Sequence, residues 1–217
     1  MKWTLGVAIW LAFLPVANGQ SQPRAEDGQP RPRQISALAN AAPALAAHSS
    51  AYWSAQRKLK EITDNGRLTP APAKTTVLSA EEINAYLAEG GVTLPDGVQR
   101  VHFSSVPGTV TATARIDFDR LTATRKINNP LMAALFTGVH EVSVETRVSG
   151  SGGLGRTSVQ SVAIDGVNVP RMAMQFLIDY YVRPKYGPNI GLDSRFPLPA
   201  HIDAVTVGDN QVTVTQK

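Results

Sequence analysis

Residues 109–121, TVTATARIDFDRL, decide the fold class because their side chains alternate between apolar and polar. Alternation with a period of two is typical of a strand in an antiparallel sheet that has one dry and one wet face. The run 98–106, VQRVHFSSV, precedes it, and only Pro107 and Gly108 separate the two. A two-residue turn between such runs predicts an antiparallel hairpin. The apolar side chains expected on the dry face are Val110, Ala112, Ala114, Ile116 and Phe118.

The same pattern returns further along the chain and predicts strands at 139–148 and 157–164. The glycine- and serine-rich segment 149–155 between them is predicted to be a flexible hairpin loop. Near the C-terminus, runs at 202–207 and 211–216 flank a Gly-Asp-Asn turn and predict a second hairpin. We therefore expect about six strands, paired antiparallel.

Helices are predicted between these strands. Ser79 and Glu82 form the pattern of a capping box, which predicts a helix start. A short apolar helix is expected at 130–137, begun by proline and closed by glycine. In 170–186, polar side chains recur at every fourth position and apolar ones cover most of the circumference, whereas a surface helix needs an apolar stripe only about 100° wide. We expect this last helix to be enclosed, either as a filled core element or as one wall of a ligand cavity.

Together these elements predict an α+β fold in which a twisted antiparallel sheet wraps or packs on one long apolar helix, with a helical N-terminal extension. That domain spans 77–217. Residues 1–19 have a basic start, an apolar run and small residues at the end, as in a secretory signal peptide. Residues 20–34 predict a disordered, proline-rich tether, and 35–76 an alanine-rich helical segment with a linker. We expect an exported protein, periplasmic or extracellular, that stays tethered if the signal is not cleaved.

Composition and charge exclude several classes of function. The chain of 217 residues is 43% hydrophobic, too apolar to be wholly disordered, and it has no cysteine for a disulfide, a thiolate metal site or a thiol nucleophile. Its net charge is +4, but residues 20–74 hold eight basic and four acidic side chains, whereas 75–217 hold twelve and thirteen. A neutral domain argues against nucleic acid as a partner. The basic tether allows peripheral contact with a membrane at most.

Several short sequence patterns are candidates for a metal-binding, phosphate-binding or catalytic site. Asp117 and Asp119 would share the wet face of a strand without a third ligand, which indicates a solvated surface rather than a metal site. The glycine-rich stretch 150–155 lacks the Lys-Ser/Thr ending of a phosphate-binding loop. His102 and His140 lie in predicted strands, and a hydrolase would need a serine or aspartate within hydrogen-bond reach of one of them. We predict no catalytic residue, no metal and no cofactor, and a protein that is not an enzyme.

Two sequence motifs suggest a relationship. The domain opens with LSAEEINAYL at 78–87 and ends with FPLP at 196–199 followed by IDAVTV at 202–207. These motifs resemble small bacterial envelope proteins of the tubular lipid-binding (TULIP-like) type, over about residues 77–217. The resemblance implies a twisted antiparallel sheet wrapped around a long helix, an apolar tunnel, and binding or shuttling of acyl-chain molecules in the cell envelope. It carries no ligand residue over to this chain.

The function expected from these observations is binding of a hydrophobic ligand, an apolar small molecule or lipid, by an exported protein. The alternative is a structural or adaptor domain with an envelope protein as partner, which would use the terminal hairpin edge or the helix 170–186 and expose an apolar patch. The ligand-binding hypothesis places one wall of the cavity on the helix and the other on residues facing it. The wall residues are Met172, Met174, Phe176, Leu177, Tyr180 and Tyr181, facing Ile116, Phe118, Leu135 and Phe136.

Overall fold

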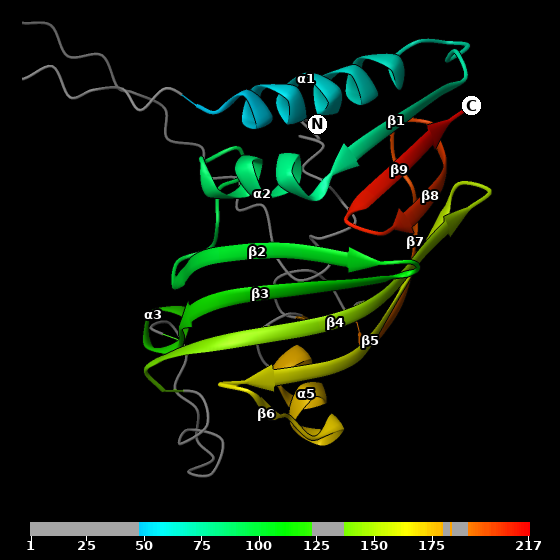
Figure 1. Cartoon of the computed structure of the whole chain (residues 1–217). Coiled ribbons are helices and arrows are strands. Elements are labelled where there is room, and N and C mark those ends of the chain that lie inside the picture. Colours follow the sequence, from blue (N-terminus) through cyan, green and yellow to red (C-terminus); the bar gives the residue numbers. More distant parts are fainter. Residues whose placement is uncertain (1–47, 123–136, 180–182, 184–190) are drawn as a thin grey trace, which may run out of the picture.

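The computed structural model describes residues 48–122, 137–179, 183 and 191–217 of the chain (Figure 1). The predicted signal peptide and the tether at 20–34 lie outside these residues, as does the short helix predicted at 130–137 except for Thr137. The elements in chain order are α1 (Ser50–Asn65), β1 (Lys74–Ser79), α2 (Ala80–Ala88), β2 (Val98–Val106), β3 (Thr109–Asp117), α3 (Phe118–Thr122), β4 (Val139–Ser151), β5 (Leu154–Ile164), β6 (Val167–Asn168), α5 (Arg171–Leu177), β7 (Asp193–Pro197), β8 (Ile202–Gly208) and β9 (Gln211–Gln216).

The described strands form one antiparallel sheet in two parts. β2, β3, β4 and β5 are consecutive neighbours, with β6 and β7 both paired to β5, and β1, β9 and β8 form a three-stranded ribbon. The parts join where Gly150 of β4 pairs with Val205 of β8 and the Gly108 amide donates to the Val207 carbonyl at 3.0 Å. The antiparallel sheet and both predicted hairpins are confirmed, with nine strands among the described residues rather than six.

The predicted long apolar helix is wrong. α5 has seven residues, Arg171–Leu177, and no long apolar helix occurs in the described part of the chain. No side chain caps its start and no acidic residue lies in its first turn, so its stability depends on packing. Only one side is covered: Ala173 and Met174 are buried, whereas Arg171 and Met172 are exposed. The apolar circumference was interpreted as a sign of enclosure, but the sheet packs on a single face of this short helix.

The hairpin predicted at 149–155 is present, but its turn is short and most of the segment lies in the strands. β4 continues to Ser151 and β5 begins at Leu154, which pairs with it, so a two-residue turn of Gly152 and Gly153 joins the strands. Both glycines have positive φ, 58° and 74°, the conformation that a tight type I′ hairpin turn requires. The capping box at α2 is confirmed, since the Ser79 hydroxyl accepts from the Glu82 amide and the Glu82 carboxylate accepts from the Ser79 amide.

Two apolar clusters hold the described elements together. The terminal core joins α1, α2 and the ribbon to one end of β2–β4, and α1 enters it through Ile62. Its members are Ile62, Leu78, Ile83, Phe103, Val110, Val148, Ile202, Val205, Val207, Val212 and Val214. The sheet core lies where α5 meets β4 and β5, and its members are Phe118, Val142, Val159, Val162, Met174, Ile178 and Leu192. Within the described ranges, no helix is long and apolar enough to cross a membrane.

Candidate functional site: an apolar sheet face between two helices

One face of the four neighbouring strands β2–β5 is apolar across the full width of the sheet. The strand register places two adjacent rows of side chains on it, each row crossing all four strands. The rows are Val101–Ala114–Val142–Ile164 and Phe103–Ala112–Val144–Val162. On the opposite face, the neighbouring rows are His102–Thr113–Ser143–Ala163 and Ser104–Thr111–Glu145–Ser161. The alternation in 109–121 therefore separates a dry face from a wet one, as predicted.

Helices cover the two sides of the apolar face. On the β2 side α2 packs, where Ile83 lies in the terminal core with Phe103, whose side chain is completely buried. An amide on α2 fixes this contact, because Asn84 donates to the Phe103 carbonyl at 2.9 Å and accepts from its amide at 2.6 Å. On the β5 side lies α5 (Figure 1), and Met174 of this helix and Ile178, which follows its last residue, belong to the sheet core.

Between the two helices lies an apolar strip formed by Val98, Val101, Ala112 and Ala114. These four side chains are half-buried and belong to neither core cluster. In both rows the β3 position is an alanine, flanked by larger side chains on β2 and β4. An alanine methyl stands less far from the sheet than valine or phenylalanine, so the face is lowest along β3. Half-buried apolar side chains between two covering helices make this strip the candidate ligand-binding surface.

The structure brings four of the ten predicted site residues together. Phe118 and Met174 lie in the sheet core, and Ile116 and Phe176 pack against it half-buried. Met172 points away, with 84% of its surface exposed. Leu135, Phe136, Tyr180 and Tyr181 lie outside the described residues, as does the side chain of Leu177.

The residues of the apolar strip were missed as site residues. Ala112 and Ala114 were placed on the dry face by their alternation, but small side chains at that position carry no signal of partial exposure. Exposure depends on where α2 and α5 end above the sheet, which the local pattern does not contain. Val98 and Val101 come from the first strand of the same hairpin.

His140 is held by two acceptors rather than poised as a base. Its Nδ1 lies 2.6 Å from the Asp165 carboxylate and its Nε2 lies 2.6 Å from the Thr137 carbonyl. These bonds to Asp165 and Thr137 raise the pKa of His140, because both ring nitrogens donate when the imidazole is protonated. Asp165 also accepts from the Glu141 amide, and the His140 bond lowers the pKa of Asp165. With both nitrogens engaged, neither can accept a proton from a nucleophile.

The acidic pair considered as a metal site is divided between two elements. Asp117 ends β3 and accepts from the Arg120 amide at 3.1 Å, whereas Asp119 lies in α3. Among the described residues, no group of three or more histidine, cysteine, aspartate or glutamate side chains could hold a metal ion.

Comparisons of the chain with protein-family models, with curated proteins and with solved structures find no match. The resemblance to tubular lipid-binding proteins therefore stays a prediction. What supports a function is the geometry of the apolar face.

Proposed function

We propose that the protein binds an extended hydrophobic ligand, such as the acyl chain of a lipid, on the apolar strip, and that it does so as an exported protein of the cell envelope. One observation carries this proposal: two apolar rows cross four strands, helices cover both sides, and the β3 alanines between them are half-buried. A filled core would place large, fully buried side chains at these positions.

The energetics of burial support the same proposal. Each methylene that leaves water for an apolar environment contributes about 0.8 kcal/mol. Six methylenes laid along the strip between Phe103 and Phe176 would thus contribute about 5 kcal/mol, before the cost of immobilising the ligand. The alanines of β3 are shorter than the side chains that they face on β2 and β4, which suits a chain laid along the strip.

The test uses two tryptophan substitutions on adjacent residues of β3. Ala114→Trp fills the strip, whereas Thr113→Trp adds the same ring to the polar face. We expect the purified wild-type protein to yield a stoichiometric amount of extracted lipid. In Ala114→Trp the amount of lipid should fall at least tenfold, which corresponds to the loss of about two buried methylenes or more. In Thr113→Trp it should stay unchanged. Circular dichroism checks that both variants fold. Equal loading of the two variants, or wild-type protein without lipid, would contradict the proposal.

A second candidate function rests on a different observation. Met172 of α5 and Val167 of β6 are 84% and 71% exposed, and the two elements are neighbours in the chain. Exposed apolar side chains of this size favour a protein contact, as expected for an adaptor domain. Met172→Asp would then release a co-purifying protein without changing lipid loading. If the partner stays bound to Met172→Asp, this second function is wrong.

A further inference from the structure

Three arginines gather on the polar face of the sheet, at the end where β4 and β5 turn. Arg156 of β5 stands directly opposite Arg195 of β7, and Ser149 of β4 faces Arg156 on its other side. Arg147 lies two residues from Ser149 on β4 and so projects from the same face. All three arginines are exposed. Like charges on directly paired residues destabilise a sheet, so this arrangement needs a reason other than folding.

Nearby acids do not neutralise these arginines. None of the three forms an ion pair within the part of the chain that the structure describes. The acid beside them, Asp193, already accepts from the Ser158 hydroxyl at 2.5 Å and from Arg171 at 3.2 Å. These bonds, that of Ser158 first, lower the pKa of Asp193.

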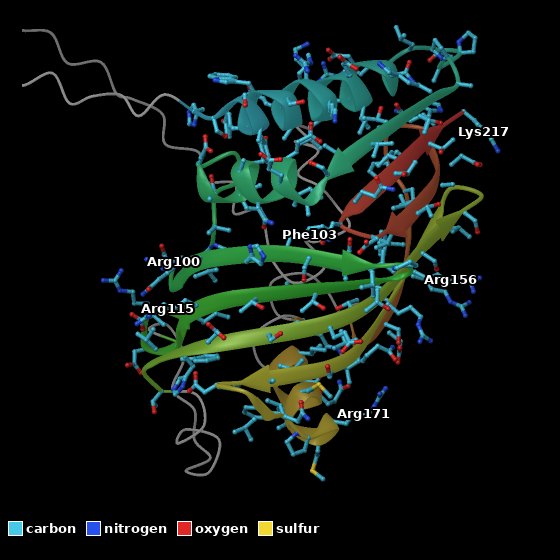
Figure 2. The ribbon with its side chains drawn as sticks, viewed as in Figure 1. Arg100, Phe103, Arg115, Arg156, Arg171 and Lys217 are labelled. Carbon is cyan, nitrogen blue, oxygen red and sulfur yellow. The ribbon has the colours of Figure 1, made fainter. Side chains whose placement is uncertain are left out.

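The other arginine pair of the same face shows the contrast. Arg100 and Arg115 also stand opposite each other, on β2 and β3, but Arg115 faces Glu141 on its other side. Figure 2 shows these two arginines at one end of the strands and Arg156 at the opposite end. The surplus of positive charge is therefore local to the end that carries Arg147, Arg156 and Arg195.

Exposed apolar side chains lie beside the three arginines. Leu154, two residues before Arg156 on the same face, is 54% exposed next to the Gly152–Gly153 turn. Val106 is 56% exposed at the neighbouring hairpin turn, and it pairs with Thr109, which pairs with Arg147. The amide of Val148 donates to the Gly108 carbonyl at 3.0 Å, which holds the Pro107–Gly108 turn against β4, four residues before the Gly152–Gly153 turn. We call this surface, formed by Val106, Arg147, Leu154, Arg156 and Arg195, the arginine tip.

We propose that the arginine tip docks the protein on a bilayer of anionic phospholipid. Guanidinium groups bind phosphate oxygens in a bidentate manner, and an anionic membrane surface attracts each basic side chain near it. Leu154 and Val106 project from the same face, on either side of the charges, and would enter the headgroup region, where apolar side chains gain by burial. An acidic protein would neutralise the arginines, but its charged side chains would then lie against the apolar side chains of Leu154 and Val106. The proposal does not depend on a ligand at the apolar strip, which lies on the other face of the sheet.

The test measures co-sedimentation of the purified protein with vesicles of equimolar phosphatidylcholine and phosphatidylglycerol, and with vesicles of phosphatidylcholine alone. We expect binding to the anionic vesicles only, weakened by salt. Arg156→Glu should lower the affinity about tenfold, since it reverses one charge at the tip. The matched control, Arg100→Glu, makes the same change of charge at the other end of the same face and should leave affinity within about twofold.

Leu154→Ser separates apolar insertion from charge. It should weaken binding severalfold while leaving the dependence on salt unchanged, because the phosphate contacts remain. Three results would overturn the proposal. The first is that Arg156→Glu and Arg100→Glu lower the affinity for anionic vesicles equally, and the second is that the protein binds both kinds of vesicle equally. The third is that the protein binds an acidic protein and that anionic vesicles do not compete with this binding. Thermal unfolding checks that each variant is folded. We expect Arg156→Glu to fold, because an acidic side chain opposite Arg195 removes the repulsion between two paired arginines.

Discussion

The terminal core and the sheet core pack on the same sheet, but they differ in the buried polar side chains that accompany them and in the number of buried apolar side chains. In the terminal region, two large buried polar side chains have several hydrogen-bond partners. Gln216, 1% exposed, donates to the Ile62 and Ala200 carbonyls and accepts from Asn65. Glu82 is buried as well and accepts from Lys58 at 2.6 Å and from the Ser54 hydroxyl at 2.6 Å. Partners of this kind compensate for the loss of water.

Among the described residues, the sheet core has fewer buried members than the terminal core. A seven-residue helix without a side-chain cap covers it, and Ile116, Val144 and Phe176 pack against it only half-buried. Because the terminal core holds more buried apolar side chains among the described residues, we expect it to contribute more to the stability of the fold than the sheet core. Under the proposed function, the partly buried apolar side chains of the other end serve the ligand.

The largest effect is expected for a large side chain in the terminal core. Phe103→Ala removes a completely buried ring and should lower the free energy of unfolding by about 4 kcal/mol, measured by urea denaturation. Phe176→Ala, the matched change at the half-buried edge of the sheet core, should cost less than half as much and reduce lipid loading. Equal losses of stability would mean that the two cores are closed to the same degree.

A smaller loss is expected when the buried amide of β9 is removed. Gln216→Ala leaves the Ile62 and Ala200 carbonyls without a donor and should cost about 2 kcal/mol. Gln211→Ala, at the exposed start of the same strand, should change stability by less than about 0.5 kcal/mol. Urea denaturation of both variants measures the difference, and a similar small effect of the two would show that the buried network contributes nothing.

Low pH should reduce the stability of the terminal region, because Glu82 becomes protonated. Burial opposes its charge, but the bonds from Lys58, Ser54 and the Ser79 amide outweigh it and lower the pKa of Glu82 below its ordinary value of 4.5. A lowered carboxyl pKa contributes stability above pH 4.5, and this contribution is lost as pH falls through the folded-state pKa. Thermal unfolding of Glu82→Gln should show a shallower loss of stability in acid than wild type. Parallel pH profiles would contradict this role.

The opposite dependence, and the smallest effect, is expected at the sheet-core end. The bonds to Asp165 and Thr137 raise the pKa of His140 above 6.5, so its contribution is fully present below pH 6.5 and is lost as pH rises through the folded-state pKa. His140 is partly exposed, which limits the effect. His140→Gln should remove a small decline in melting temperature above neutral pH, and NMR titration of the ring measures the pKa directly. A pKa at or below 6.5 would contradict the geometry.

Much of the fold was predictable because strand pairing follows local alternation. The hairpins at β2–β3 and β8–β9 and the capping box of α2 occur where the pattern placed them. β1 and β7 were missed, since KTTVLS and DSRFP have weak alternation and become strands by pairing with β9 and β5, far away in the chain. The prediction of a long enclosed helix at 170–186 was wrong, because apolar residues around most of a helix do not show how many of its sides are covered by other elements.

The sequence by itself determined which side chains share a face, which turns are tight and where α2 begins, since each depends on residues a few positions apart. Only the tertiary structure decided that Phe103 is buried while Ala114 is half-exposed, although both lie on the same apolar face. The physical reason is that burial depends on what packs above a residue. Here α2 and α5 pack on the two sides of the face and leave the side chains at its centre half-buried, while the arginines of three strands meet only when the strands pair.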